Sequence, residues 1–171
     1  DLAAKTCGVP VIIHEQNAVA GTANRLLVPM TSRVCEAFPG TFAASQTLRS
    51  TGNPVRPELF TLAPRAALEG RKARLLVLGG SLGAEPLNKL LPEALAKVPA
   101  DVRPEVFHQA GKQHDRITAE RYAAVGVEAD VQPFIKDMAH AYGWADLVVC
   151  RAGALTVSEL AAAGLPSLLV P

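Results

Sequence analysis

From residue 74 to the C-terminus, short apolar runs alternate in strict order with longer segments of helical character. Each apolar run has the length of a β-strand and is bounded by glycine, proline or polar residues. Such alternation is typical of a parallel sheet whose strands are joined by right-handed helical crossovers. We therefore predict a doubly wound α/β layer structure. The expected strands are 74–78, 105–110, 127–131, 146–150 and 167–170, and the expected helices are 86–97, 112–124, 136–142 and 155–163.

The N-terminal part of the chain follows this alternation less regularly. The sequence Gly52-Asn53-Pro54 interrupts it, because the residue before a proline is disfavoured in a helix, and Pro57 follows closely. The stretch 52–64 is therefore the best candidate for a linker. The elements expected before it are a buried strand at 9–13, the polar cluster His14-Glu15-Gln16-Asn17 at the end of that strand, a short helix at 21–28, a strand at 32–37 and one more short strand within 38–51.

The turn from Arg151 to Glu159 carries the clearest chemical signal. It follows an apolar strand, contains Gly153 and opens a helix. A helix N-terminus presents unpaired backbone N–H groups and a partial positive charge, so it can hold a phosphate. Glu159, one turn into the helix, can accept hydrogen bonds from the hydroxyls of a ribose. The plainer alternative is a capped helix in which Thr156 or Ser158 satisfies the first-turn donors and the acid is solvated.

A second glycine-rich turn, Gly79-Gly80-Ser81-Leu82-Gly83-Ala84, follows the expected strand at 74–78. Two such turns in one chain suggest a nucleotide held between them. The turn is not a Walker A loop, because no Gly-Lys-Ser/Thr follows. Residues 107–111 offer no acid at the position that binds ribose in NAD sites, which argues against that cofactor. A tight packing turn is the alternative interpretation.

Charge and composition exclude other classes of protein. Seventeen basic and sixteen acidic residues leave a net charge of +1, which gives no general reason to expect a nucleic acid as partner. No two histidines have the spacing of metal ligands, and no Asp-x-Asp is present to hold magnesium-bound diphosphate. We therefore expect neither a metal site nor a cofactor.

Six motifs follow one another along the chain: His14-Glu15-Gln16-Asn17, Gly52-Asn53-Pro54-Val55-Arg56, the glycine turn at 79–84, His108-Gln109-Ala110-Gly111-Lys112, Phe134-Ile135-Lys136-Asp137-Met138 and the turn at 151–159. Together they resemble the MurG family, the bacterial UDP-N-acetylglucosamine:N-acetylmuramyl-(pentapeptide) pyrophosphoryl-undecaprenol N-acetylglucosaminyltransferases. The resemblance covers essentially the whole chain, and six motifs in this order are far more specific than any one of them.

The resemblance implies the GT-B fold, with two Rossmann-like doubly wound parallel-sheet domains that are both incomplete in this chain. Residues 1–55 would be the C-terminal part of the acceptor-side N-terminal domain. Residues 56–171 would be the N-terminal part of the C-terminal domain, which binds UDP-GlcNAc. The chain is then an internal fragment, inactive by itself, without the N-terminal glycine-rich loop and the glutamine-rich segment that the family has after Pro171.

The activity implied by the resemblance is that of an inverting, metal-independent glycosyltransferase. The C4 hydroxyl of MurNAc in lipid I attacks the anomeric carbon of UDP-GlcNAc, UDP leaves, and lipid II forms for peptidoglycan synthesis, cell shape and cell division. The implied location is the cytoplasmic face of the bacterial inner membrane, as a peripheral membrane protein. Contact with the anionic membrane surface would be made through the missing N-terminal domain.

Residue by residue, the resemblance implies a binding site for UDP-GlcNAc. Ile135 would contact uracil through its backbone, Ser81 would meet the diphosphate, and Glu159 would hold the ribose hydroxyls. Arg56 would lie in the donor site, and Asn17 would reach the GlcNAc from the other domain. The residues expected to line the diphosphate and the sugar are Ala154, Leu155, Thr156, Val157 and Ser158.

The catalytic general base stays unassigned: His14 and Glu15 are candidates, and the missing N-terminal loop offers another. Two alternatives to the proposed activity remain open. Another GT-B enzyme that acts on a UDP-sugar, a transferase or an epimerase, would share the chemistry of residues 56–159 without the full order of motifs. An inactive nucleotide-binding module is the second alternative.

Overall fold

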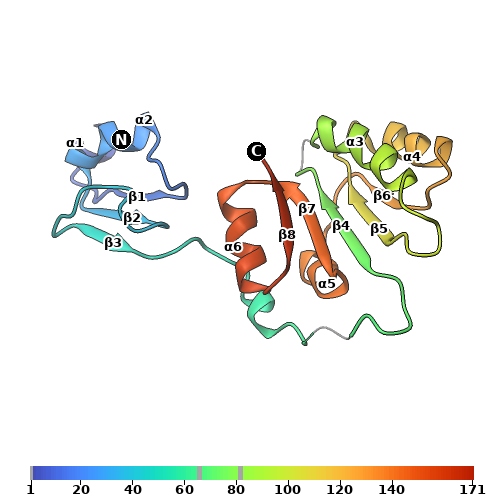
Figure 1. The fold of residues 1–171 in the computed structure, drawn as a ribbon. Coiled ribbons are helices and arrows are strands. Elements are labelled where there is room, and N and C mark those ends of the chain that lie inside the picture. The colour runs from blue at the N-terminus through green and yellow to red at the C-terminus, as the bar shows by residue number, and fades with distance from the viewer. Residues whose placement is uncertain (1, 65–66, 81–82) are drawn as a thin grey trace. The chain divides into compact units, whose positions relative to one another are not determined.

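The computed structural model describes residues 2–64, 67–80 and 83–171. The chain divides into two compact units, Asp1–Val55 and Arg56–Pro171 (Figure 1). Each unit contains a parallel sheet; helices join all consecutive strands of the second sheet and the first two strands of the first sheet. In the described ranges, no helix is long and apolar enough to cross a membrane.

The first unit is built on a three-stranded parallel sheet. Ile13 lies opposite Val34 across the first strand pair, and both side chains are buried. In their order across the sheet, the strands are Ile12–Glu15 (β1), Arg33–Glu36 (β2) and Leu48–Ser50 (β3). The helices are Leu2–Thr6 (α1), Thr22–Leu27 (α2) and the 3₁₀ turn Val28–Met30 (η1).

Strand β1 lies further along the chain than the strand expected at 9–13. It begins at Ile12, where pairing with β2 starts, and the preceding Pro10 has no N–H to give to a neighbouring strand. His14 and Glu15 are therefore part of the strand instead of the loop that follows it. The strand alternates between exposed and buried positions, and Glu15 occupies a buried one.

The second unit is built on a five-stranded parallel sheet. The alternation of strands and helices expected after residue 74 is confirmed. In their order across the sheet, the strands are Asp130–Gln132 (β6), Glu105–Gln109 (β5), Arg74–Leu78 (β4), Leu147–Arg151 (β7) and Ser167–Val170 (β8). The helices are Glu85–Ala96 (α3), Asp115–Ala124 (α4), Met138–Trp144 (α5) and Ala154–Ala162 (α6), and the 3₁₀ turn Pro57–Thr61 (η2) precedes them.

Strand β6 and helix α5 begin later than expected. β6 pairs with β5 from Asp130, because Val127 donates its N–H to the carbonyl of Tyr122 and thereby closes α4. α5 begins after Asp137, whose side chain accepts the backbone N–H of His140 at 2.9 Å and caps the helix. In both cases a local hydrogen bond at a helix end sets the boundary.

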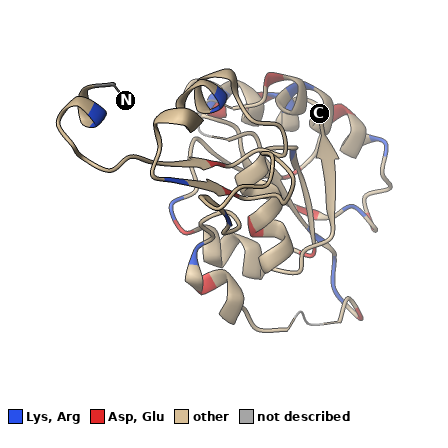
Figure 2. Cartoon of the chain, turned by 90° about the vertical axis from the view of Figure 1, so that its left-hand side faces the viewer, with Lys and Arg blue, Asp and Glu red and all other residues tan. Residues whose placement is uncertain are grey.

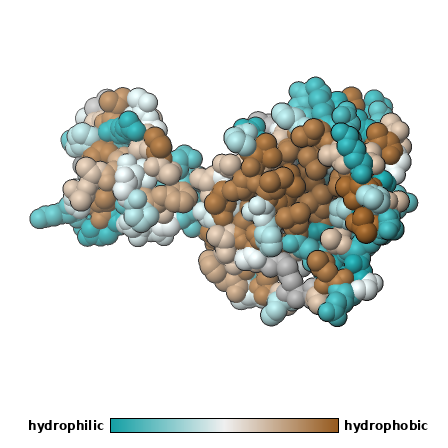
Figure 3. Space-filling view, viewed as in Figure 1, coloured by the Kyte–Doolittle hydropathy of each residue, from teal (hydrophilic) through white to brown (hydrophobic). Residues whose placement is uncertain are grey.

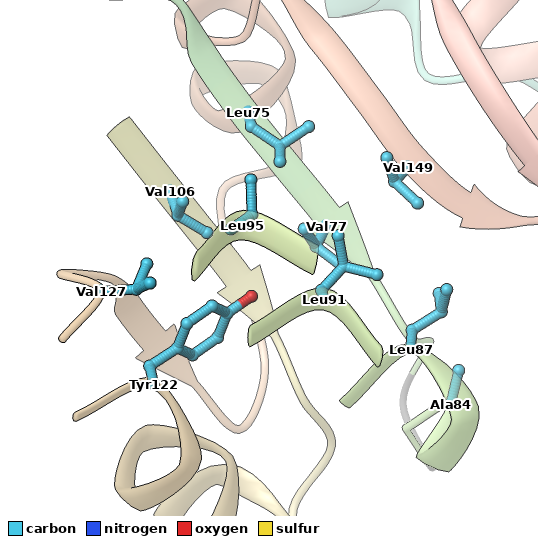
Figure 4. Packing of buried hydrophobic residues seen from close by; sticks show 10 residues of the cluster. All are labelled: Leu75, Val77, Ala84, Leu87, Leu91, Leu95, Val106, Tyr122, Val127 and Val149. Carbon is cyan, nitrogen blue, oxygen red and sulfur yellow. The ribbon is translucent and has the colours of Figure 1, made fainter. Parts of the chain in front are cut away.

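The central strand β4 is buried on both faces. Leu75 and Val77 pack against α3 and α4 in one hydrophobic cluster (Figure 4), and Leu76 and Leu78, which alternate with them, are also buried. A strand covered on both faces is typical of parallel sheets, and each buried leucine or valine contributes about 1.5–3 kcal/mol. The cluster contains Leu75, Val77, Ala84, Leu87, Leu91, Leu95, Val106, Tyr122, Val127 and Val149.

Charged and apolar side chains are distributed differently over the surface. Basic and acidic residues are interspersed along the ribbon (Figure 2), in keeping with the near balance of charge. A broad apolar area covers α6 and β8 (Figure 3), where Leu155, Leu168 and Leu169 are exposed. An apolar surface therefore lies at the β8 edge of the second sheet.

Candidate functional site

The direction in which strands are added to the second sheet reverses at β4. The chain crosses from β4 to β5 and β6 on one side, and then returns to the other side of β4 to form β7 and β8. At such a topological switch point, the loops that leave two neighbouring strands diverge and form a crevice. The glycine turn after β4 and the turn that begins with Arg151 both start there, since Leu78 pairs with Cys150 at the strand ends.

The glycine turn packs tightly against the end of β5. A Cβ atom at Gly79 would lie 3.0 Å from the carbonyl oxygen of Gln109, and one at Gly83, where φ is +80°, would lie 2.2 Å from that of Ala110. No side chain fits at 2.2 Å, so close packing alone explains why position 83 is a glycine. The only argument for ligand binding by this turn is therefore its position at the switch point. Ser81, expected at the diphosphate, lies outside the described residues.

A chain of buried hydrogen bonds fixes the backbone against which this turn packs. Asn88 Nδ2 donates to the carbonyl of Ala110 at 2.9 Å, so Asn88 Oδ1 faces His108 and accepts from its Nε2 at 3.0 Å. His108 Nδ1 therefore accepts the hydroxyl of Tyr122, also at 3.0 Å. Burial lowers the pKa of His108 to about 4, so the ring is neutral near pH 7. The carbonyl against which Gly83 packs is thus fixed by both α3 and β5.

Helix α6 begins directly after the second turn. Its N-cap residue is Gly153, which has no side chain with which to cap the first-turn amides. The positive end of the helix dipole therefore lies at the switch point. Ser158 donates its hydroxyl to the carbonyl of Ala154 at 2.9 Å. The residues expected to line the diphosphate and the sugar, Ala154, Leu155, Thr156, Val157 and Ser158, form the start of this helix.

Glu159 lies on α6 with 6% of its surface exposed, so it is not a solvated acid. Its Oε1 accepts a hydrogen bond from Arg56 Nη1, and its Oε2 accepts one from the hydroxyl of Tyr142 at 3.0 Å. A cation and a neutral donor together make burial of this carboxylate tolerable. Arg56 belongs to the second unit and opens η2, whose Leu59 is buried.

Two further side chains, neither of them expected in the site from the sequence, lie near the same sheet edge. Tyr142 of α5 is buried, and burial together with the nearby carboxylate of Glu159 raises its pKa, so the hydroxyl stays protonated. Gln109, the last residue of β5, accepts the backbone N–H of Ile135 at 2.9 Å through Oε1. Gln109 stood inside a recognised motif, whereas Tyr142 had only the appearance of a core aromatic residue.

The loop that contains Ile135 borders a cavity of about 470 Å³ beside β5 and β6. The rings of Phe107, Phe134 and Trp144 line this cavity, and Phe107 and Trp144 meet edge to face. The other side of the lining is polar, with Asp130, Gln132, Lys136, Asp137 and His140, so the cavity combines aromatic surface with hydrogen-bonding groups. The segment expected to contact a base therefore has a hollow next to it.

In the first unit, Glu15 organises the loop after β1. Its carboxylate accepts hydrogen bonds from the backbone N–H and Nδ2 of Asn17, from the N–H of Gly21 and from Nδ2 of Asn24. These bonds, led by that of Gly21, lower the pKa of Glu15 to about 2. So weak a proton acceptor is poorly suited to general base catalysis at neutral pH. Glu15 instead holds the exposed Asn17 in place.

The other candidate base in this unit, His14, also has a hydrogen-bond partner. Its Nε2 lies 2.9 Å from the carbonyl oxygen of Gly52, which can only accept, so Nε2 carries the proton. Nδ1 is then the basic nitrogen of the neutral ring. Among the residues that the structure describes, no group of three or more His, Cys, Asp or Glu side chains could hold a metal ion.

Residues 74–171 match the family model of the glycosyltransferase family 28 C-terminal domain. The chain belongs to glycosyltransferase family 28. Over 170 residues, this chain is 81% identical to a relative from Pseudomonas fluorescens (strain Pf-5) and 79% identical to one from Pseudomonas putida (strain W619). Both relatives are named UDP-N-acetylglucosamine--N-acetylmuramyl-(pentapeptide) pyrophosphoryl-undecaprenol N-acetylglucosamine transferase. The alignments cover 99% of this chain and 48% and 47% of the relatives, so the chain spans about half of their length.

Solved structures agree with this assignment. In the crystal structure of Acinetobacter baumannii MurG, the protein is 46% identical to this chain in sequence. The TM-score is 0.78, and the match covers 99% of this chain and 48% of the MurG chain. The glycotransferase of kitacinnamycin is 16% identical, with a TM-score of 0.65 over 99% and 54% of the two chains, and shares the fold. The resemblance inferred from the six motifs and the expected GT-B class of α/β fold are confirmed.

Proposed function

We propose that the protein containing this chain is an inverting N-acetylglucosaminyltransferase. It moves GlcNAc from UDP-GlcNAc to the C4 hydroxyl of MurNAc in lipid I and so forms lipid II for peptidoglycan. Membership of family 28 and the names of relatives about 80% identical over this chain support the proposal.

The observation that carries the nucleotide part of the proposal is the buried carboxylate of Glu159 at the start of α6. A buried acid beside a topological switch point and a helix N-terminus suits a ligand that combines hydroxyl donors with phosphate acceptors. The ribose hydroxyls would donate to Glu159, and the backbone of Ile135 would contact the uracil. Arg56 would face the same donor site through its ion pair with Glu159.

Departure of UDP creates negative charge on the diphosphate, which has to be stabilised in the transition state. The start of α6, from Ala154 to Ser158, and the glycine turn containing Ser81 would meet this charge with backbone donors and the helix dipole. Such stabilisation needs no divalent cation. The second unit is therefore the donor-binding part of the proposed enzyme.

The first unit would contribute to the acceptor side. Asn17, which Glu15 fixes through two hydrogen bonds, would reach the GlcNAc moiety. The general base stays unassigned, and the pKa of Glu15 disfavours that residue. The acceptor is a membrane lipid, so we place the protein at the cytoplasmic face of the bacterial inner membrane. It would be a peripheral protein that contacts the anionic surface through a part of the N-terminal domain outside this chain.

The test uses the full-length protein with UDP-GlcNAc and a soluble lipid I analogue. We expect transfer of labelled GlcNAc with inversion at the anomeric carbon, and no transfer to an analogue whose MurNAc C4 hydroxyl is replaced by hydrogen. UDP-N-acetylgalactosamine serves as the control donor and is expected to react much more slowly. Failure to use the intact analogue, or equal transfer to the analogue without the hydroxyl, would contradict the proposal.

A further inference from the structure

The two partners of Glu159 differ in how firmly they can hold it. The side chain of Arg56 is half exposed and long, whereas Tyr142 is buried and has a rigid ring. We propose that Tyr142 is a positioning residue, which orients the Glu159 carboxylate so that it accepts two hydroxyls of a vicinal diol. This inference rests on the proposed nucleotide site and adds the residue that gives the site its preference for ribose.

A glutamate alone would be poorly oriented for this task. The last torsion of a glutamate side chain has a broad energy profile, so the plane of the carboxylate rotates unless both oxygens are held. In the structure both are held, Oε1 by Arg56 and Oε2 by Tyr142. Removing the Tyr142 hydroxyl would leave one oxygen without its neutral donor and free the plane to turn.

Lone-pair capacity explains why a diol fits. An ionised carboxylate accepts about four hydrogen bonds, two on each oxygen. Arg56 and Tyr142 use one on each oxygen, which leaves one on each for a ligand. Two hydroxyls on adjacent carbons match that arrangement, because each donates to a different oxygen. The diphosphate of the same ligand would lie toward the N-terminus of α6.

The hydroxyl of Tyr142 is suited to act as a permanent donor. Burial, and the charge of Glu159, raise its pKa, so it does not ionise near neutral pH. Tyr142 as a whole is 1% exposed, so water does not compete for the hydrogen bond. Only two tyrosines occur in the chain, and the other, Tyr122, is equally buried and bonds to the neutral His108.

The experiment compares Tyr142→Phe with the unchanged full-length protein by titration calorimetry. The probes are UDP and 2′,3′-dideoxyuridine diphosphate, which lacks both hydroxyls. We expect Tyr142→Phe to bind UDP about three- to tenfold more weakly and the dideoxy compound within about twofold of the unchanged protein. Tyr122→Phe is the matched control, since it removes a buried hydroxyl from the same unit and should leave the preference for ribose intact.

The possible outcomes separate the inference from the proposed function. If both ligands weaken equally in Tyr142→Phe, the residue has a general structural role and the inference is overturned. The same holds if neither ligand changes. If the unchanged protein binds the two ligands equally, the diol role of Glu159 is wrong although a nucleotide site remains. If the unchanged protein does not bind UDP, the proposed function itself fails.

Discussion

The side chain of Gln109 accepts the backbone N–H of Ile135 at 2.9 Å, which joins the end of β5 to the loop after β6. Both residues are buried. The uracil contact proposed for Ile135 would use the same segment of backbone, so a base that accepts from this N–H competes with Gln109. Binding of the base then requires that the Gln109 amide turn away.

Replacing Gln109 by leucine removes the competing acceptor while it keeps an apolar side chain of similar size. We expect the free energy of unfolding to fall by about 1–3 kcal/mol, because a buried N–H loses its partner. UDP should bind as tightly as before or more tightly. Chemical denaturation and calorimetry on the full-length protein measure both effects, and clearly weaker UDP binding would contradict the competition.

Replacing Glu159 by alanine removes the proposed acceptor of the ribose hydroxyls. We expect UDP binding to weaken by about 1.5–3 kcal/mol, the usual range for hydrogen bonds to a charged group. The loss should be the same for UDP and UDP-GlcNAc, since both carry the ribose. Calorimetry with the two ligands gives the comparison.

The alanine variant also leaves Arg56 and Tyr142 without their acceptor, so a second variant is needed. Glu159→Gln keeps the volume and one acceptor oxygen while it removes the charge. Its affinity for UDP should lie between those of the alanine variant and the unchanged protein. Equal UDP affinity in all three, with each of them folded, would return Glu159 to a purely structural role.

Chelation of divalent metal ions should not abolish transfer. We expect turnover of UDP-GlcNAc by the full-length protein to persist in EDTA, because the proposed stabilisation of the leaving diphosphate comes from backbone donors and the α6 dipole. Initial rates with and without chelator are the measurement. Complete loss of turnover that magnesium or manganese restores would show that a metal ion takes part.

Acid should destabilise the second unit through His108. The pKa of this histidine is lowered from 6.5 to about 4, so between these values the unfolded chain binds a proton that the folded chain does not. The free energy of unfolding is therefore unaffected by this histidine above about pH 6.5. It decreases as the pH falls toward 4, with a slope of at most about 1.4 kcal/mol per pH unit. Protonation of the buried Glu15 lowers the free energy of unfolding only at more acidic pH, because the pKa of Glu15 is lowered from 4.5 to about 2.

Native-state hydrogen exchange of the peptide that carries β5 reports this loss in the full-length protein, after correction for the intrinsic exchange rate. The matched variant is His108→Gln, which keeps a donor and an acceptor without the titration. Its protection should depend less on pH between 4 and 6.5. The same pH dependence in both proteins would mean that another group causes the effect.

The sequence was most informative where local pattern and tertiary environment agree. Strands β4 and β8 have the predicted bounds, and α3 lies within one residue of its own, because each is a continuous apolar or amphipathic run. β1 and β6 were shifted, since the pattern of side chains does not reveal where pairing partners begin. Val127 looked like a strand residue and instead closes α4.

The site was partly readable for a related reason. Glycine turns and the acid at 159 recur at fixed places relative to strands, so their motifs could be recognised along the chain. The hydrogen-bond partners of these residues could not be predicted, because Tyr142 lies on another helix and Arg56 lies 103 positions away from Glu159. Glu15 shows the same limit: its position in a motif suggested chemistry, and only its four donors reveal that it is a structural anion.

Arg56 stands one peptide bond after Val55, where the first unit ends, and its guanidinium reaches the acid at the heart of the proposed nucleotide site. A ligand that engages Glu159 therefore also alters what tethers the first residue of the second unit. A substitution of Arg56 would therefore change the first residue of the second unit and remove the ion pair of the proposed site in a single step.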